Sequence, residues 1–203
     1  MLLTIYLLIA LILSASILYR YSGKRYKVYL LVMLVLMVGG LIVENDGISK
    51  NNWVWNVESP LFFSIPIYMI LIYGCFGVAI SVLAVHFNST LKFKASDSVK
   101  RCALPALMLG ALTLITAPLY GLNNSLLMMF LFATAYLFLK YQSPIIVLSG
   151  VSLALIDILF DSLLVLSGEL HYSIMIPYKT FFIAGMFISG LSIFLDEKLY
   201  HKK

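Results

Sequence analysis

The chain has 203 residues, of which 62% are hydrophobic and 11% are charged, and its formal net charge is +5. With a mean hydropathy of +1.01, it carries more apolar surface than a soluble domain of this size could bury, so the composition excludes that class and predicts an integral membrane protein. The excess of positive charge is read as topological, because lysine and arginine gather on the cytoplasmic side of membrane proteins. No nucleic-acid partner is therefore expected.

Seven apolar stretches approach or exceed the roughly 20 residues that a helix needs to cross the bilayer core. They cover residues 2–19, 28–44, 60–86, 104–120, 125–140, 144–167 and 176–195. In lipid, every backbone group must find its partner within the protein, and continuous apolar runs do so as helices. The sequence thus predicts an all-α fold in which residues 1–203 form a single domain, a bundle of seven transmembrane helices.

The charges between these stretches predict the orientation of the bundle. If seven spans are present, the first, third and fifth loops and the tail share one side of the membrane. That side holds most of the basic residues, namely Arg20, Lys24, Arg25, Lys27, Lys92, Lys94, Lys100, Arg101, Lys140, Lys198, Lys202 and Lys203. The N-terminus is therefore predicted outside and the C-terminus in the cytoplasm, and we expect the protein among the lipids of a prokaryotic plasma membrane.

The first candidate site segment, residues 40–60, reads GLIVENDGISKNNWVWNVESP. Glu44 ends the second predicted span, and the asparagines and glycine after it are turn formers. Trp53 and Trp55 fit the aromatic belt of a membrane interface. Alternatively they roof a cavity, where their ring faces would stabilise a positive charge. In this second interpretation Asn45, Trp53 and Trp55 bind a substrate beside Glu44.

The second segment is LALIDILFDSLLVLSG, residues 153–168, within the sixth predicted span. A spacing of four places Asp157 and Asp161 on one face of a helix. A carboxylate that faces lipid is costly, so this face is expected to turn to the bundle interior or to a watery cavity. Burial and mutual repulsion both favour the neutral form of a carboxyl group, so at least one is expected to hold a proton. The alternative is a pair that only hydrogen-bonds between helices.

The third segment, SGELHYSIMIPYKTFF at residues 167–182, precedes the last predicted span. Gly168 is expected to end one helix and Pro177 to begin the next, with His171 and Tyr172 at the interface between them. The sequence has no HExxH motif, paired cysteines or clustered histidines, so no metal is expected. It also has no phosphate-binding glycine motif and no DDxxD cluster, which argues against an enzyme that acts on a prenyl diphosphate.

Two of these segments resemble the signatures of the carotenoid biosynthesis membrane protein family, which includes the archaeal bisanhydrobacterioruberin hydratases. The residues that resemble the first signature are Glu44, Gly47, Trp53, Trp55 and Pro66. Those that resemble the second are Asp157, Asp161, Gly168, Tyr172, Pro177 and Phe181. The chain departs from the second signature at Lys179 and Thr180. The layout is also similar to that of the seven-helix membrane terpene cyclases of fungal meroterpenoid pathways.

Both resemblances imply a cofactor-independent enzyme that protonates a double bond or epoxide of a lipophilic isoprenoid, a carotenoid or terpenoid, and leads to hydration or cyclisation. Asp157, Asp161 and Glu44 would be catalytic, while Asn45, Trp53, Trp55 and Tyr172 would bind the substrate. Two other classes stay open. The acids could form the relay of a proton-coupled transporter or channel, or they could face a partner if the chain is an accessory subunit of a membrane complex.

Overall fold

The computed structural model describes residues 2–21, 23–57, 61–62, 64–91, 122–173 and 178–201, and these residues are mostly helical. The helices are α1 (Leu2–Tyr21), α2 (Tyr26–Ser49), α3 (Ile67–Leu91), α6 (Leu122–Tyr141), α7 (Pro144–Leu166) and α8 (Tyr178–Tyr200). The strands are β1 (Trp53–Trp55), β2 (Leu61–Phe62), β3 (Ile65–Pro66) and β4 (Leu170–Tyr172).

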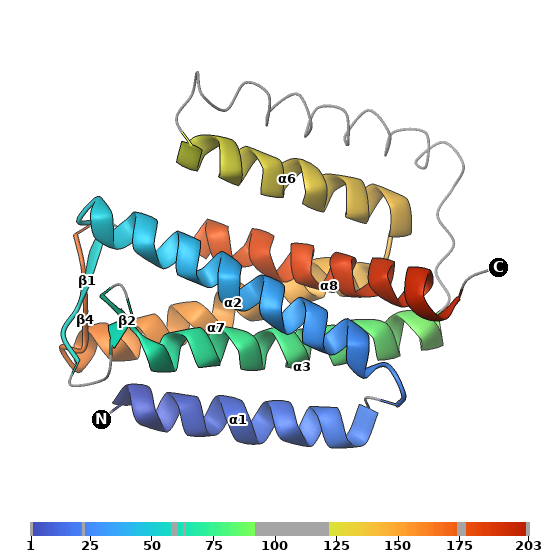
Figure 1. The fold of residues 1–203 in the computed structure, drawn as a ribbon, viewed down its shortest axis with the longest axis horizontal. Helices are drawn as coiled ribbons and strands as arrows, with labels where there is room; N and C mark the ends of the chain where they lie inside the picture. Colours follow the sequence, from blue (N-terminus) through green and yellow to red (C-terminus); the bar gives the residue numbers. More distant parts are fainter. Residues whose placement is uncertain are drawn as a thin grey trace.

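The helices lie side by side with similar directions, and α3 and α8 occupy the middle of the bundle (Figure 1). α3 packs against α1, α2, α7 and α8, while α8 also packs against α2, α6 and α7. The buried apolar residues accordingly come more from α3 than from any other helix, with further contributions from the inner faces of α1, α2, α7 and α8.

Two short antiparallel ladders cap the end of the bundle at which α1 begins (Figure 1). In the first ladder β1 pairs with β4, so that Trp53 stands opposite Tyr172 and Trp55 opposite Leu170. In the second, β2 pairs with β3 in a tight hairpin. The β1–β4 ladder joins the segment after α2 to the segment after α7, which lie far apart in the sequence.

Six of the seven predicted spans overlap helices of the described part of the chain, and the remaining one, residues 104–120, lies outside it. Within the described ranges, four helical segments are long and apolar enough to cross a membrane, namely Leu2–Tyr21, Tyr26–Ser49, Ile67–Ser89 and Pro144–Leu166. The helical class and the presence of potential spans are thus confirmed.

Two boundaries differ from the prediction. α2 does not stop at Glu44 but continues to Ser49, because Asp46 pairs with Lys50 one turn on and the chain turns only at Asn51, whose φ is +56°. The third span does not begin at residue 60. Residues 61–62 pair with residues 65–66 as β2 and β3, Ser64 between them has a φ of +63°, and the helix begins at Ile67.

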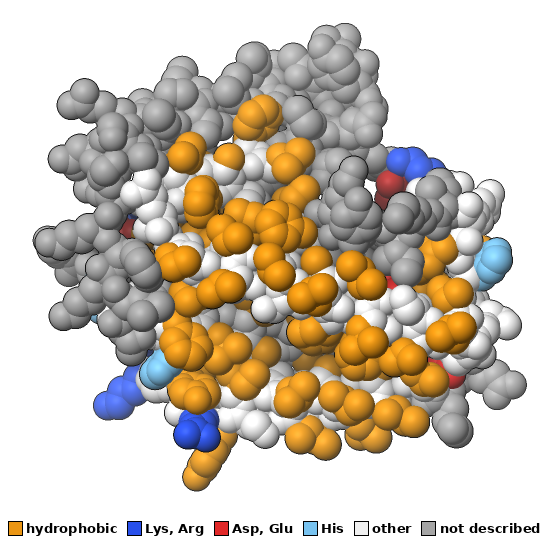
Figure 2. Space-filling view, turned by 180° about the vertical axis from the view of Figure 1, so that it is seen from behind, with side chains coloured by type: hydrophobic (Ala, Val, Ile, Leu, Met, Phe, Trp, Pro, Cys, Tyr) orange, Lys and Arg blue, Asp and Glu red, His pale blue; other side chains and the backbone are white. Residues whose placement is uncertain are grey.

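The surface matches the composition. Apolar side chains cover the middle of the face in Figure 2, and the lysine and arginine side chains stand toward its two ends. The exposed large apolar residues include Leu8, Ile12, Leu13, Leu30, Leu34, Leu155, Leu159 and Leu166. These side chains lie on the outer faces of α1, α2 and α7, which are thus suited to contact lipid.

Candidate active site

Glu44 lies buried near the end of α2 and accepts three hydrogen bonds. The indole Nε1 groups of Trp53 and Trp55 donate to its Oε2 at 2.8 and 3.0 Å, and the hydroxyl of Tyr73 donates to Oε1 at 2.5 Å. Its side chain is only 4% exposed. All three partners are donors, which is the arrangement that a carboxylate satisfies because it accepts and cannot donate.

Two glycines of α2 make room for these partners. A Cβ at Gly47 would overlap the six-membered ring of Trp53, and a Cβ at Gly40 would overlap the ring of Tyr73. Because Gly40 and Gly47 have no side chain, the surface of α2 has room for a ring on either side of Glu44. This gives the glycine of the Glu44–Gly47 pattern a structural role, since it lets Trp53 lie flat on α2.

Asp157 and Asp161 both lie buried on the inner face of α7, at 6% and 5% exposure. The hydroxyl of Tyr172 donates to Asp161 Oδ2 at 2.5 Å. Burial and the nearby acids raise the pKa of Tyr172, so the phenol keeps its proton and remains a donor. In the described part of the chain, no residue donates a hydrogen bond to Asp157.

The structure brings the two acidic segments together. Asp157 and Asp161 lie close enough to Glu44 for their charges to interact. The β1–β4 ladder holds the ring of Trp53 against that of Tyr172, with centroids 5.8 Å apart, so a partner of Glu44 touches the partner of Asp161. The two segments thus form a single cluster, here called the acidic end.

The turn after α7 fixes the position of Tyr172. Gly168, with a φ of +74°, donates its N–H to the carbonyl of Val165, and the N–H of Glu169 bonds to that of Leu164. This is a Schellman motif, in which glycine readily adopts the left-handed conformation. The prediction that Gly168 ends the helix is thereby confirmed, whereas Pro177 lies outside the described residues.

Glu169 ties this turn to the start of α1. Its Oε1 and Oε2 accept the backbone N–H groups of Leu2 and Leu3 at 2.7 and 2.9 Å, which are donors that the first turn of a helix leaves unpaired. Partial burial acts to raise the pKa of Glu169, but the hydrogen bonds from the start of α1 outweigh it and leave the pKa below its usual value. The loop and α1 are therefore held together beside Tyr172.

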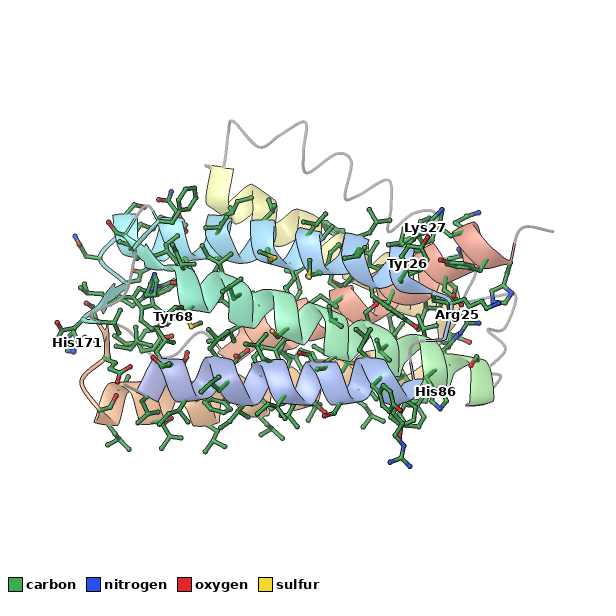
Figure 3. The ribbon with its side chains drawn as sticks, turned by 60° about the horizontal axis from the view of Figure 1, so that its bottom comes forward. Arg25, Tyr26, Lys27, Tyr68, His86 and His171 are labelled. Atoms are coloured by element: carbon green, nitrogen blue, oxygen red, sulfur yellow. The ribbon has the colours of Figure 1, made fainter. Side chains whose placement is uncertain are left out.

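Two of the residues singled out in the sequence stand apart from the cluster. Asn45 follows Glu44 directly, but its side chain is exposed on the other side of α2. His171 alternates with Tyr172 along β4 and points outward at the tip of the bundle (Figure 3). The structure thus brings Glu44, Trp53 and Trp55 to the acids of α7, and leaves Asn45 and His171 at the surface.

Two aromatic residues of the acidic end were not anticipated. Tyr73 is a partner of Glu44, and Tyr6 of α1 is buried with its ring stacked on Phe160 of α7. Both tyrosines sit inside long apolar runs of the sequence. No local pattern in these runs distinguishes a tyrosine that faces the acids from one that faces outward.

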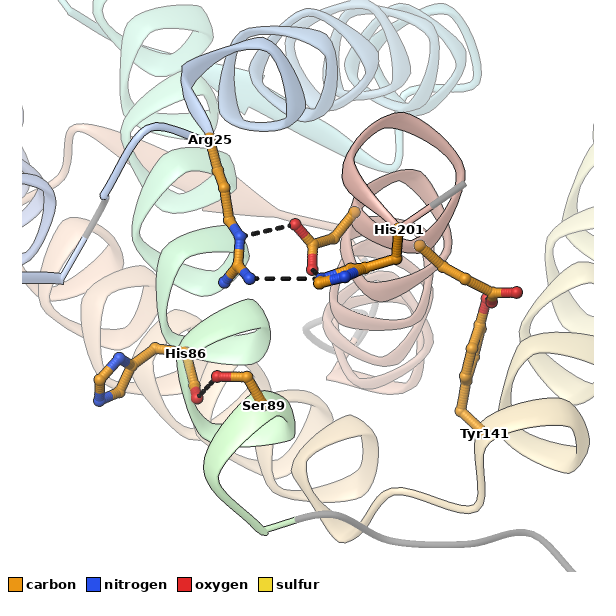
Figure 4. A network of polar contacts seen from close by, with 7 residues as sticks. Arg25, His86, Ser89, Tyr141 and His201 are labelled. Carbon is orange, nitrogen blue, oxygen red and sulfur yellow. Dashed lines mark hydrogen bonds and ion pairs between the residues drawn. The ribbon is translucent and has the colours of Figure 1, made fainter. Parts of the chain in front are cut away.

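The opposite end of the bundle carries a separate polar network (Figure 4). Arg25 Nε lies 2.9 Å from Asp196 Oδ1, and His201 Nε2 lies 3.4 Å from Asp196 Oδ2. Glu197 accepts hydrogen bonds from Lys140 Nζ and the hydroxyl of Tyr141. Burial raises the pKa of Asp196, although Arg25 and His201 act against it. This network ties α2 and α6 to the end of α8.

A cavity of about 290 Å³ lies beside this second network and not at the acidic end. Its lining residues are Val85, Asn88, Ser89, Tyr141, Ile193, Asp196, Glu197 and His201. The two ends are separated by a buried apolar layer that includes Val28, Val32, Val82, Leu153 and Ile188. Within the described ranges, no group of three or more metal-ligating side chains is arranged to hold a metal ion.

Comparisons with known proteins find a similar fold but do not assign the chain to a family. No family model matches the sequence, and no curated protein matches it. Among solved structures, the fold is similar to that of MvINS in a crystal structure of a cross-linked trimer of its arginine-to-cysteine variant. The two chains are 14% identical with a TM-score of 0.55, over 88% of this chain and 98% of that one. At this identity the likeness shows a shared fold alone.

Proposed function

We propose that the protein is an integral membrane enzyme that protonates a double bond or epoxide of an isoprenoid, with hydration or cyclisation as the outcome. The observation that carries the proposal is the convergence of three buried acids inside the bundle, where Trp53, a donor to Glu44, contacts Tyr172, the donor to Asp161. Acids buried at membrane depth are costly and usually functional. The proposal includes a bundle of seven spans, with the acidic end at the outer side of the membrane.

The hydrogen bonds divide the roles among the three acids. Glu44 accepts from three donors and Asp161 from one, whereas Asp157 has none among the described residues. Hydrogen bonds to a carboxylate favour its ionised form. Asp157 is therefore proposed as the neutral acid that gives up the proton, Glu44 as the fixed carboxylate, and Asp161 as the group that tunes Asp157.

The reaction balances without a cofactor. The O–H proton of Asp157 passes to one carbon of the alkene, whose π electrons form the new C–H bond and leave a tertiary cation on the other carbon. In hydration, a water oxygen bonds to that carbon and its extra proton returns to a carboxylate. In cyclisation, an internal alkene attacks the cation to form a C–C bond, and the new cation then loses a C–H proton to a carboxylate, its C–H electrons forming a new C=C bond. The faces of Trp53, Trp55 and Tyr172 would steady the cation.

Two features of the structure favour an enzyme over the other classes. The buried apolar layer between the two ends opposes a continuous polar path, which a proton-coupled transporter or channel would need. The burial of Asp157 and Asp161 within this chain opposes an accessory subunit whose acids face a partner. The resemblance to carotenoid hydratases and to membrane terpene cyclases adds support to the same chemistry.

The test is expression in cells that supply carotenoid or terpenoid substrates, followed by mass analysis of the extracted lipids. Hydration adds one water to the substrate mass, and cyclisation leaves the mass unchanged while altering retention. We expect Asp157→Asn to abolish product, because the amide cannot supply the proton, and Asp161→Asn to lower it at least tenfold, within the range that general acids contribute.

The matched control is Asp46→Asn, an exposed acid of α2 paired with Lys50, which should leave product formation unchanged. Expression level and elution volume in detergent confirm that each variant folds. Full activity in both Asp157→Asn and Asp161→Asn would remove the proposed chemistry.

A further inference from the structure

The phenol of Tyr6 is the polar group of the acidic end that the proposed reaction does not yet use. Its side chain is 2% exposed, and its ring lies flat on Phe160 of α7, with centroids 3.5 Å apart and planes 3° apart. The ring also contacts Phe76 of α3 at 5.9 Å. In the described part of the chain, the hydroxyl of Tyr6 has no hydrogen-bond partner. In native proteins nearly all buried hydroxyl groups are hydrogen-bonded, so an unpaired one needs an explanation.

The stacking partner determines where this hydroxyl lies. Phe160 follows Asp157 by three residues, so the two side chains are neighbours on the surface of α7. Tyr6 therefore sits beside the two carboxyl groups, close enough for their charges to act on it. A donor without an acceptor thus lies near Asp157, which is itself an acid without a donor among the described residues.

We propose that Tyr6 is a substrate-binding residue whose hydroxyl donates a hydrogen bond to an oxygen atom of the ligand next to Asp157. The ligand class is then an oxygenated isoprenoid, with a hydroxyl, epoxide or carbonyl oxygen. For an epoxide, Asp157 gives its proton to the ring oxygen, one C–O bond breaks, and its electron pair stays on the oxygen as a hydroxyl while the carbon becomes the cation. This inference rests on the proposed function for the isoprenoid part of the ligand.

The two tryptophans provide a binding assay that does not require turnover. The chain contains only two tryptophans, and both donate to Glu44 at the acidic end. Their fluorescence should therefore respond to any ligand that enters. The probes are squalene and its 2,3-epoxide, which share one carbon chain and differ by a single oxygen, titrated into the purified full chain in detergent.

We expect the wild-type chain to bind the epoxide more tightly than the hydrocarbon, and Tyr6→Phe to lower this preference about fivefold, as the loss of one neutral hydrogen bond would. The comparison of preferences cancels the unequal partition of the two probes into the micelle. Tyr21→Phe is the matched control, because it removes a phenol from the same helix about 22 Å away and should keep the wild-type preference.

Each other outcome overturns the inference in a distinguishable way. If Tyr6→Phe keeps the wild-type preference for the epoxide, the Tyr6 hydroxyl does not donate a hydrogen bond to the ligand oxygen. Equal binding of both probes to the wild-type chain also overturns the inference but leaves an enzyme that protonates hydrocarbons. If neither probe changes the tryptophan fluorescence, the result contradicts both the proposed isoprenoid function and this inference.

Thermal unfolding without ligand separates a ligand oxygen from a resident water. If the ligand supplies the oxygen, Tyr6→Phe removes an unpaired hydroxyl from the free protein, and its unfolding midpoint should equal or exceed that of the wild type. If a bound water already joins Tyr6 to Asp157, the midpoint should fall by several degrees. A fall with an unchanged epoxide preference would overturn the proposal in favour of that water.

Discussion

At the scale of single residues, the three buried acids differ in their hydrogen-bond partners more than in their burial. Glu44, Asp157 and Asp161 are all at most 6% exposed, yet they accept three, no and one hydrogen bonds, respectively, from the described side chains. In a medium of low dielectric constant each donated hydrogen bond stabilises a negative charge strongly. The number of hydrogen-bond donors, and not the degree of burial, is therefore what can give these three carboxyl groups different roles.

Glu44→Gln tests whether Glu44 is held as a carboxylate. The amide NH₂ of glutamine would face donors that now point at a carboxylate oxygen, so at least one buried hydrogen bond would be lost. We expect the free energy of unfolding in detergent to fall by about 1–3 kcal/mol. Asp46→Asn on the same helix should change it by less than about 0.5 kcal/mol, because its pair with Lys50 is at the surface. An unchanged stability for Glu44→Gln would mean that Glu44 is a neutral acid.

At the scale of elements, the sequence predicted what depends on local spacing and missed what depends on distant pairing. The four-residue spacing placed Asp157 and Asp161 on one face of α7, and Gly168 marked the end of that helix. The β1–β4 ladder joins segments more than a hundred residues apart, and no local pattern of Trp53 or Tyr172 could specify that register.

The buried faces of α1 and α3 were also out of reach of a sequence argument. In a soluble helix, apolar residues repeat on one face and reveal the core. In α1 and α3 the runs that hold Tyr6 and Tyr73 are hydrophobic all round, so no such repeat marks their buried faces. What could be predicted was therefore the acids, which are costly in either surrounding, together with Trp53, Trp55 and Tyr172 in the turns, but not Tyr6 and Tyr73 inside the apolar runs.

Glu169 provides a prediction about how α1 is fastened to the β4 loop. Its pKa lies below the ordinary value of 4.5 in the folded chain, so its contribution to stability is present above that pH and is lost as the pH falls through the folded pKa. At neutral pH, Glu169→Gln should cost about 0.3–1 kcal/mol, the usual range for an exposed anion at a helix N-terminus. The difference between wild type and variant should shrink steadily below pH 4.5.

Thermal unfolding across this pH range measures the difference, and hydrogen exchange of the first turn of α1 locates it. Glu197→Gln serves as the control, since it perturbs the network at the opposite end and should leave exchange at Leu2 and Leu3 unchanged. A gap between wild type and Glu169→Gln that persists into strong acid would show that the carboxylate charge is not what fastens α1.

At the scale of the whole molecule, the bundle has two ends of opposite character. Arg25, Lys27 and His86 lie at one end and His171 at the other (Figure 3), and the acidic end is separated from the basic one by the buried apolar layer. At the basic end lie the helix ends that are joined by the first, third and fifth loops. These loops and the C-terminal tail carry most of the lysines and arginines of the sequence. Such an asymmetry is what a bundle inserted with its basic end in the cytoplasm would have.

The orientation can be tested with single cysteines at the two ends, in a background where Cys75 and Cys102 are replaced by alanine. Lys24 and His171 are both exposed and lie at opposite ends. In intact cells, a maleimide that cannot cross membranes should label the His171→Cys variant at once and the Lys24→Cys variant only after permeabilisation. The reverse pattern would place the acidic end in the cytoplasm, and labelling of both in intact cells would mean that the bundle does not span the membrane. The result also bears on chemistry, because an acidic end near the outer leaflet can receive only substrates that reach that leaflet.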